Sequence, residues 1–256
     1  MIVIKKPTGG IRIVNNFIKL NSKTVTEPYL MTNMNQLLAR AAGCRYITRI
    51  DLSLAYFQVI LHPNSRKYTA FQTEIGGLRY KRMAMGLKNA PATCQKLMNK
   101  ILRGLYHYAG SLLDDIAIFS TEFEQHLNHV EQVLKRLRDA GLTANPKKCI
   151  FASNELRLLG RHLKDCKVYP DPTKVQVMTE YPVLTTKAKL KSYLGLTSFF
   201  RSYIPHYAEI AFPLTELTAK NKPDKLKWGT QEQIAFERLK QALLTKPVLR
   251  PPDMTK

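Results

Sequence analysis

The chain has 256 residues, 45% of them hydrophobic, so it is long enough for one or two domains with a substantial core. Its 40 Lys and Arg residues outnumber its 19 Asp and Glu residues, which gives a formal net charge of +21. Its four cysteines have no paired spacing, which excludes a disulfide framework and a zinc ribbon, and no apolar run approaches the ~20 residues of a membrane span.

The positive charge is spread along the chain. Residues 1–121 contain 17 basic and only five acidic residues, a net charge of +12, and the remainder carries +9. A spread excess favours a long surface that follows phosphate groups over a detachable basic tail. Ribosome-like packing and simple solubility charge are the alternatives. Charge and proline follow Met1 too soon for a signal peptide, so we expect a soluble, intracellular protein with reduced thiols and no membrane partner.

Apolar spacing and turn residues predict alternating helices and strands in the first half of the chain. The expected elements, in order, are a β-hairpin from strands 2–4 and 11–14, a helix over 30–43, a strand over 46–52, a hairpin over 71–80 around Gly76-Gly77, a helix over 91–106, and a hairpin from runs 112–113 and 116–119. Asp114 and Asp115 are expected at the tip of that last hairpin.

In the second half, Thr121-x-x-Glu124 predicts a capping box at the start of a helix. That helix is expected to end at Gly141 and to bury one apolar face, formed by Phe123, Leu127, Val130, Leu134 and Leu137. Short apolar runs with turn signals follow over 149–163. Helices are then expected at about 173–180, 186–204 and 230–244, with a domain boundary near 167–170.

The two adjacent carboxylates of Asp114 and Asp115 suggest a metal site. Such neighbours repel each other, and one rises in pKa unless a cation cancels the charge; carboxylate oxygens are ligands that Mg²⁺ prefers. Asp51 ends a strand pattern 63 residues earlier and joins them if the strands are sheet neighbours. Three such carboxylates could hold two ions ~3.5–4 Å apart for in-line phosphoryl displacement. An exposed Asp-Asp turn is the alternative.

A series of short motifs runs through nearly the whole chain. They are Ile50-Asp51-Leu52-x-x-Ala55-Tyr56-x-Gln58, Thr69-Ala70-Phe71-x-Thr73, Gly86 to Gln95, Leu113 to Ser120, Gly141 to Cys149, Leu159-Gly160, Leu194 to Thr197, Tyr203-Ile204-Pro205, Pro213-Leu214-Thr215, and Phe236 to Asp253. In this order they resemble the reverse transcriptase domain of a gypsy-type LTR retrotransposon Pol polyprotein.

The resemblance implies an α+β fold, the polymerase right hand. Fingers, N-terminally truncated, would comprise 1–45 and 59–89. A palm with a ferredoxin-like βαββαβ sheet would comprise 46–58 and 90–166. A helical thumb would occupy 167–222, and 223–256 would begin the connection before a missing RNase H domain.

The implied function is RNA-directed DNA polymerisation, in which a primer 3′-hydroxyl attacks a dNTP. The implied cofactor is a pair of Mg²⁺ ions, with Mn²⁺ as a substitute. The implied partners are an RNA or DNA template–primer duplex, dNTPs, and downstream RNase H and integrase segments of the same polyprotein. Location in a cytoplasmic virus-like particle or in the nucleus stays open.

The resemblance also implies site residues. Asp51, Asp114 and Asp115 would be the catalytic metal ligands. Nucleotide-binding residues would be Lys5, Lys6, Arg12, Tyr56, Met85 and Gly86, with Tyr56 excluding a ribose 2′-hydroxyl. Template–primer residues would be Asn89, Pro91, Gln95, Leu112, Leu159, Gly160, Lys191 and Gly195. The alternatives are core packing for Tyr56, a solvated hairpin for the N-terminal basic residues, and a core-facing stripe for Lys191, Gly195 and Phe199.

Several positions depart from the family pattern. Leu112 replaces a usual Tyr, Asn15-Asn16-Phe17-Ile18 replaces Val-Asp-Tyr-Arg, and Met83-Ala84-Met85 replaces Met-Pro-Phe. Arg161, Lys164 and Lys167 stand where His, Ser and Gly are common. These departures suggest either a fragment of a longer polyprotein or a decaying or repurposed element. One alternative function is therefore a catalytically inactive relic that still binds nucleic acid. A binding or scaffolding module without a polymerase cleft is a separate alternative.

Overall fold

The computed structural model describes residues 2–5, 9–181 and 184–244, and the chain divides into two compact units, Met1–Ser153 and Asn154–Lys256. This division lies before the boundary predicted near 167–170. The reason is that the strands after Asn154 pair with one another in a sheet of their own. The finer division into fingers, palm, thumb and connection stays a prediction.

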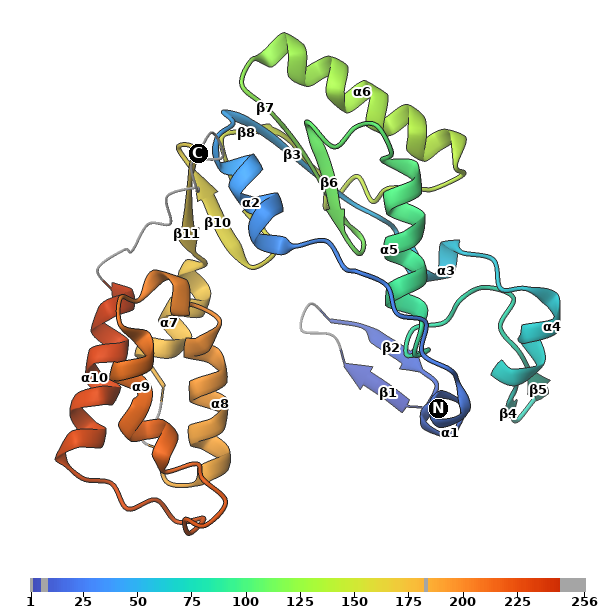
Figure 1. The fold of residues 1–256 in the computed structure, drawn as a ribbon. Helices are drawn as coiled ribbons and strands as arrows, with labels where there is room; N and C mark the ends of the chain where they lie inside the picture. The colour runs from blue at the N-terminus through green and yellow to red at the C-terminus, as the bar shows by residue number, and fades with distance from the viewer. Residues whose placement is uncertain (1, 6–8, 182–183, 245–256) are drawn as a thin grey trace. The chain divides into compact units, whose positions relative to one another are not determined.

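A four-stranded antiparallel sheet forms the centre of the first unit (Figure 1). Its order is β6 (Ala109–Leu112), β7 (Asp115–Ser120), β3 (Tyr46–Asp51), β8 (Ile150–Ser153). Helix α5 (Ala90–Ile101) connects β3 to β6, and α6 (Phe123–Asp139) connects β7 to β8. Strand order and connections therefore follow the βαββαβ pattern expected from the resemblance.

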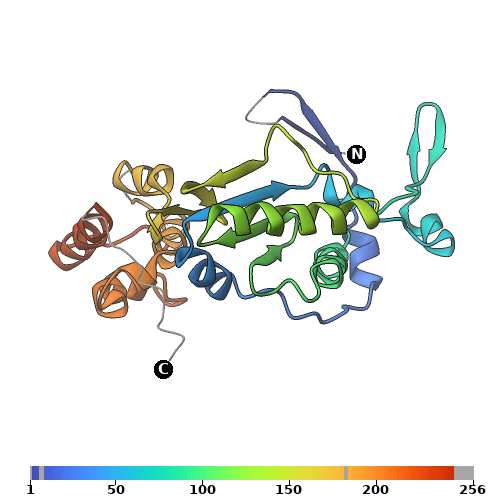
Figure 2. The same cartoon turned by 90° about the horizontal axis from the view of Figure 1, so that it is seen from above.

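The two faces of this sheet have different partners. Ile50, Ile116 and Ile118 share one buried cluster with residues of α5 and α6, and Figure 2 shows α6 lying along the sheet. Helix α2 (Met34–Ala42) contacts the sheet through Leu37, which leaves no room for a side chain at Gly110. Because side chains alternate along a strand, Asp51 and Asp115 point away from the face that carries Ile50 and Ile116.

Two small hairpins complete the strands of the first unit, and both were predicted. They pair β1 (Ile2–Lys5) with β2 (Ile11–Val14) and β4 (Phe71–Thr73) with β5 (Gly76–Leu78). The short helices of this unit are α1 (Ile18–Lys23), α3 (Ala55–Gln58), α4 (Pro63–Arg66) and the 3₁₀ turn η1 (Lys67–Thr69).

The helices predicted over 30–43 and 91–106 are shorter in the structure. Helix α2 begins at Met34 because the Asn33 side chain accepts hydrogen bonds from two backbone N–H groups of its first turn. Leu30 lies outside the helix and is exposed. Helix α5 ends at Ile101, and Leu105 reaches the core from the turns that follow it.

One prediction about α6 was wrong, and another was right only in part. The helix begins at Phe123 after Glu122, without a side-chain capping bond, so Thr121 and Glu124 form no capping box. Its buried residues are His126, Val133 and Leu137, whereas Phe123, Leu127 and Leu134 are exposed. The predicted apolar residues are therefore right in part, because Leu137 is buried and Val130 packs against the core. His126, a polar residue, occupies another buried position of the helix. Gly141 follows the helix with φ +68°, as expected for its end.

The second unit joins a three-stranded sheet to helices. The strands are β9 (Glu155–Leu158), β10 (Arg161–Lys164) and β11 (Lys167–Pro170), and the helices are α7 (Pro172–Thr179), α8 (Lys187–Ser198), η2 (Arg201–Tyr203), α9 (Tyr207–Glu216) and α10 (Thr230–Leu244). The helix predicted over 186–204 is broken after Ser198, and α9 was not predicted because Pro213 lies inside it. Within the described ranges, none of the helices is long and apolar enough to cross a membrane.

A chain of buried polar side chains fixes α6 to the sheet. His126 Nε2 lies 2.7 Å from Thr48 Oγ1, and His126 Nδ1 lies 2.9 Å from Ser120 Oγ, which also contacts His129 Nδ1 at 2.8 Å. Thr48 Oγ1 additionally accepts the backbone N–H of Ala152 at an irregularity in β8. Burial, and secondarily the neighbouring His129, lowers the pKa of His126, so the folded protein favours its neutral form.

The pKa of His126 makes stability fall on acidification. Its folded pKa lies below the ordinary value of about 6.5, so the unfolded chain takes up the proton first as the pH drops from 7 toward 5. We expect the urea midpoint to fall over this range, and to fall less in His126→Gln. The exposed His107 provides the control, and an equal decline in His126→Gln and His107→Gln would contradict the assignment.

Candidate metal and nucleotide site

Asp51 and Asp115 are direct cross-strand partners. They pair at the end of β3 and the start of β7, in the register that also pairs Ile50 with Ile116. Side chains directly opposite each other on antiparallel strands have Cβ atoms about 4.5–5.5 Å apart. The predicted neighbourhood of β3 and the aspartate hairpin is therefore confirmed, and two of the three carboxylates share one end and one face of the sheet.

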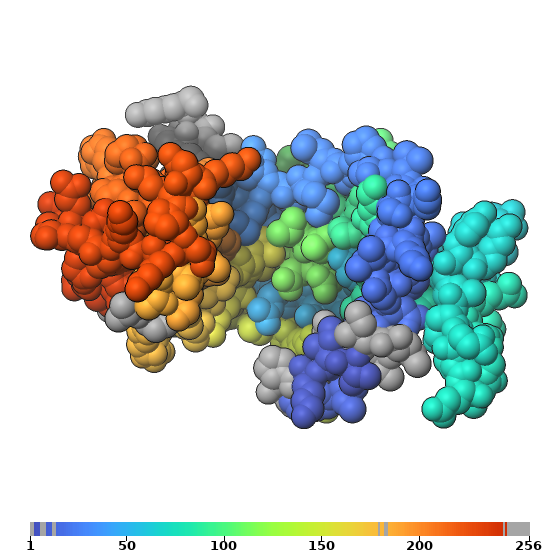
Figure 3. All heavy atoms as spheres, turned by 90° about the horizontal axis from the view of Figure 1, so that it is seen from below, coloured from blue at the N-terminus to red at the C-terminus, as the bar shows by residue number. Residues whose placement is uncertain are grey.

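Asp114 lies in the two-residue turn between β6 and β7. Leu112 pairs with Asp115, which leaves Leu113 and Asp114 as the turn. Leu113 has φ +58°, and a positive φ at the first residue is what the favoured two-residue hairpin turns require. The Asp114 carbonyl accepts the Leu52 N–H at 3.4 Å, so the turn lies against the residue that follows Asp51. Figure 3 shows green atoms, the colour that the bar gives to residues between 100 and 150, at the surface of the first unit.

The three carboxylates interact electrostatically. Burial raises the pKa of Asp115, and the charges of Asp114 and Asp51 raise this pKa further. The cations of Arg49 and Lys148 act in the opposite direction on the pKa. Lys148 Nζ lies 3.4 Å from Asp51 Oδ1, so one ammonium group already offsets part of the negative charge.

The donor chemistry of the site fits a divalent cation. Three carboxylates in one small region supply the hard oxygen ligands that Mg²⁺ prefers. Burial, and then the neighbouring charges of Asp114 and Asp51, raise the pKa of Asp115, and a bound cation would act in the opposite direction on this pKa. Among the described residues, no three or more His, Cys, Asp or Glu side chains are gathered closely enough to hold an ion as they stand. The metal-ligand roles of Asp51, Asp114 and Asp115 therefore remain proposals.

The side chain of Gln95 on α5 forms hydrogen bonds to the backbone of the aspartate turn and of β6. Its side chain is completely buried, its Oε1 accepts the Leu113 N–H at 2.9 Å, and its Nε2 donates to the Ser111 carbonyl at 3.1 Å. The predicted contact of Gln95 with template or primer stays a prediction. Its buried hydrogen bonds show a second role, because they hold the aspartate turn from the inner face of α5.

Tyr56 lies beside the acidic site. It is half-buried on α3 and packs against the main core cluster of the first unit. Burial raises the pKa of its hydroxyl, with smaller contributions from Cys94 and Asp114. Core packing and a position near Asp114 thus occur together, so the alternative that we considered for Tyr56 does not exclude a contact with nucleotide.

The other predicted nucleotide-binding residues differ in how far their side chains are exposed, and some lie outside the described residues. Lys5 is exposed at the end of β1, while Lys6 and the side chain of Arg12 fall outside the described residues. Met85 is half-buried, and Gly86 is exposed with φ +91°. The Gly86 carbonyl accepts a hydrogen bond from Asn21, which ties this turn to α1.

The predicted template–primer residues lie in both units. In the first unit, Pro91 is exposed, Leu112 is half-buried, and the Asn89 amide bonds the backbone of Val25 and Glu27. In the second, Leu159 and Gly160 form the two-residue turn between β9 and β10, with φ +51° and +71°. Lys191 and Gly195 are exposed on α8, opposite its buried residues Leu190, Tyr193 and Thr197, so a core-facing stripe is wrong for these two.

Lys148 and Arg49 were missed as members of the site. The sequence Asn145-Pro146-Lys147-Lys148 offered one signal, since it follows the helix in family order. In the structure the Asn145 N–H donates to the Asp51 carbonyl at 2.8 Å, which brings Lys148 to Asp51. Arg49 precedes Asp51 by two residues and so shares its face of β3.

Comparisons with known proteins show the family of the chain. Residues 4–198 match the family model "Reverse transcriptase (RNA-dependent DNA polymerase)". The chain belongs to the reverse transcriptase family. It is 39% identical over its whole length to the retrovirus-related Pol polyprotein from transposon 297 of Drosophila melanogaster, and 31% identical to that from transposon gypsy of the same organism. It covers 24% and 26% of these two relatives, about a quarter of each.

Solved structures share the fold of this reverse transcriptase chain. Foamy viral protease–reverse transcriptase in complex with double-stranded DNA matches with TM-scores of 0.89 and 0.88, at 24% identity in each case. The matches cover 95% and 98% of this chain and 43% and 53% of the viral chains. The mixed α+β class is thereby confirmed.

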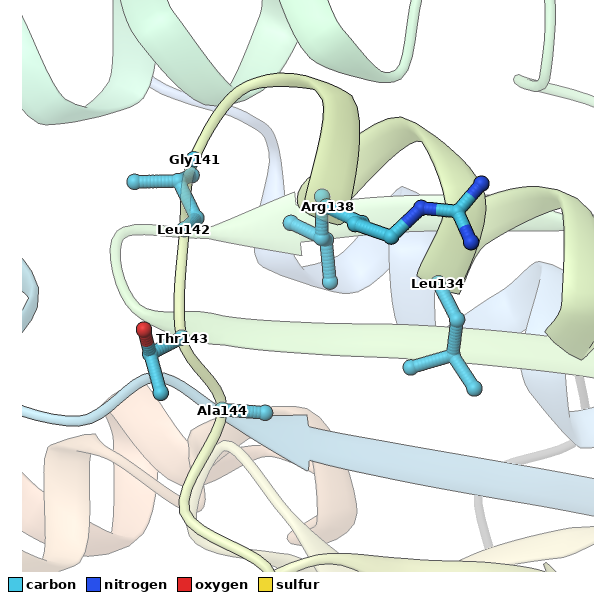
Figure 4. Close-up of a pocket in the computed structure, with 7 residues that line it drawn as sticks. Leu134, Arg138, Gly141, Leu142, Thr143 and Ala144 are labelled. Atoms are coloured by element: carbon cyan, nitrogen blue, oxygen red, sulfur yellow. The ribbon is translucent and has the colours of Figure 1, made fainter.

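A cavity of about 410 Å³ lies beside the end of α6 in the reverse transcriptase chain. Its lining residues are Leu134, Leu137, Arg138, Gly141, Leu142, Thr143 and Ala144. Figure 4 shows Thr143 and Ala144 on the segment that leaves α6 and passes the strand end. Ala144 forms a β-bridge with Leu52, so one wall of this cavity is attached to the strand that carries Asp51.

Gln95→Leu tests the support of the turn. The substitution leaves the Leu113 N–H and the Ser111 carbonyl without their buried partner, and we expect the free energy of unfolding to fall by about 2–3 kcal/mol. Urea denaturation measures this, and amide hydrogen exchange should accelerate at Leu113. Gln125→Leu, at an exposed position on α6, is the control. Equal stability of the two variants would refute the positioning role.

Proposed function

We propose that this chain is the polymerase part of a retrotransposon Pol polyprotein and that it extends a primer 3′-hydroxyl with dNTPs by two-metal phosphoryl transfer. The observation that carries the proposal is the register that pairs Asp51 with Asp115 and places Asp114 in the adjoining turn. Three interacting carboxylates on a chain of net charge +21 suit a reaction between polyanions, in which metal ions must be held beside phosphate groups.

In the proposed reaction, the primer 3′-hydroxyl attacks the α-phosphate of the dNTP, its proton is lost, and pyrophosphate leaves. Asp51, Asp114 and Asp115 would hold two Mg²⁺ ions, for which Mn²⁺ could substitute. Such ions, when bound, lower the pKa of the attacking hydroxyl and stabilise charge on the transferred and leaving oxygens. The chain's own residues orient the reactants: Tyr56 bounds the sugar of the incoming nucleotide, and Lys5, Lys6, Arg12, Met85 and Gly86 form the rest of its pocket.

The right-hand division follows from this proposal. Residues 46–58 and 90–166 would be the palm, 1–45 and 59–89 the fingers, 167–222 the thumb, and 223–256 the start of a connection. The central sheet and its aspartates fall within the proposed palm. Lys191 and Gly195 would approach the duplex from the proposed thumb, because both are exposed. No other part of the protein lies within 4 Å of a Cβ placed at Gly195, so this surface is free for a duplex to approach.

The proposed partners are a template–primer duplex and dNTPs, with RNase H and integrase segments of the same polyprotein. Structures of foamy viral protease–reverse transcriptase with double-stranded DNA and with an RNA/DNA hybrid support the first of these. The relatives named as Pol polyproteins support a polyprotein context for this chain.

Primer extension tests the proposed activity. The chain is given a DNA primer on an RNA template, dNTPs and Mg²⁺. We expect template-dependent extension that falls at least about a hundredfold in Asp114→Asn/Asp115→Asn, because the ligands for the metal ions are lost. Asp139→Asn, which removes an exposed acid of α6, should extend normally.

A wild-type chain that does not extend the primer would contradict the proposal. If that chain still bound template–primer, the result would favour the second candidate, an inactive relic that retains nucleic-acid binding. The observation that favours this candidate is Leu112, which replaces the usual Tyr beside the aspartate turn.

Salt dependence tests the nucleic-acid surface separately from catalysis. Each Lys that neutralises a phosphate contributes about −0.9 to the slope of log affinity against log salt concentration for a duplex. We expect a steep slope for the wild-type chain and a slope smaller by about that amount in Lys191→Ala. Lys135→Ala, on exposed α6, should keep the wild-type slope. A flat response in the wild type would exclude a surface that follows phosphates.

A further inference from the structure

Gln58 uses its whole amide group to hold a distant backbone segment. Its Oε1 accepts the Thr143 N–H at 2.7 Å, and its Nε2 donates to the Thr143 carbonyl at 2.9 Å. The same Nε2 donates to the Ser53 carbonyl at 2.5 Å. One side chain therefore engages both polar groups of a single residue that lies 85 positions away in the sequence.

The segment that Gln58 holds is also the segment that holds Asp51. The Ser53 N–H donates to the Thr143 carbonyl at 2.9 Å, and the Asn145 N–H donates to the Asp51 carbonyl at 2.8 Å. Figure 4 shows Thr143 and Ala144 on this segment as it leaves α6. The end of β3 and residues 143–145 thus form one hydrogen-bonded block, and Gln58 fastens α3 to it.

Helix α3 needs such a fastening. It has only four residues, Ala55–Gln58, and it follows Leu54, whose φ of +49° is unfavourable for a branched side chain. A single helical turn is not stable by itself, so tertiary contacts must fix its position. Gln58 is its last residue, and the Gln58 carbonyl additionally accepts a hydrogen bond from Arg82 at 2.7 Å.

We propose that Gln58 is the positioning residue that sets deoxynucleotide selectivity, because it holds α3, and with it the Tyr56 ring, against the block that carries Asp51. The inference rests on the proposed function of the chain and on the proposed contact of Tyr56 with the sugar. A ring that excludes a hydroxyl group by contact must be placed within a fraction of an ångström, so a loosened α3 admits the ribonucleotide.

The test measures binding without chemistry. The full chain is bound to a template–primer whose primer ends in a dideoxynucleotide, with Ca²⁺, and the dissociation constants of the next dNTP and of the matching rNTP are compared. Gln58→Met keeps the length of the side chain and removes its hydrogen bonds. We expect its ratio of rNTP to dNTP dissociation constants to fall about tenfold, while template–primer affinity is unchanged.

Two further variants separate positioning from a general structural effect. In a Tyr56→Ala background, Gln58→Met should cause no additional loss of selectivity, because Gln58 acts through the Tyr56 ring. Gln58→Glu keeps the acceptor for the Thr143 N–H and replaces the donor. We therefore expect a ratio of rNTP to dNTP dissociation constants between those of the wild type and Gln58→Met. This variant provides the test if Gln58→Met does not fold. Gln125→Met, at an exposed glutamine of α6, is the matched control.

Several results would overturn the inference. The first is an unchanged ratio of rNTP to dNTP dissociation constants in folded Gln58→Met. The second is a loss of selectivity on Gln58→Met that is equally large in the wild type and in the Tyr56→Ala background. The third is a wild-type chain that binds the dNTP and the rNTP with equal affinity. If the wild-type chain fails to extend a primer yet binds the dNTP selectively in a Gln58-dependent way, the proposed catalytic function fails and the inference about Gln58 stands.

Discussion

The hydrogen-bond register between β3 and β7 determines whether this chain has a site at all. The register opposes Asp51 to Asp115 while it buries Ile50 against Ile116. Because side chains alternate along a strand, a slip by one residue would turn the isoleucines out of the core and the carboxylates into it. The hydrophobic core and the charged site are consequently specified by the same pairing, and the burial of the isoleucines secures the position of the aspartates.

Buried amides and backbone groups then refine what the register provides. Gln95 reaches from α5 to the aspartate turn, and Gln58 reaches from α3 to residues 143–145, whose Asn145 N–H returns to Asp51. Neutral amides can do this beside three carboxylates without adding charge, whereas Lys148 brings an ammonium group into contact with Asp51. The site thus has an uncharged support from amides, and its positive charge comes from Lys148 and Arg49.

Much of this arrangement could be predicted from the sequence, and the failures have physical causes. Residues rich in β-branched side chains predicted β3, and a short apolar run predicted β7. The family motifs then identified Asp51, Asp114 and Asp115 as the acidic residues of the candidate site. Apolar spacing was right only in part for α6 because its buried positions include His126, whose polar atoms are satisfied by Ser120 and Thr48. Pro213 concealed α9, and nothing local reveals that a partner of Gln95 is a turn 18 positions later.

The left-handed backbone of Leu113 has a consequence for how the protein would respond to selection. A branched residue in this conformation costs roughly 1–2 kcal/mol relative to glycine, and the Gln95 bond to its N–H helps to maintain it. A library screened only for heat resistance would therefore enrich Gly or Asn at position 113. A library screened for a working site would retain whichever side chain best contacts its ligands, so the two screens should diverge at this residue.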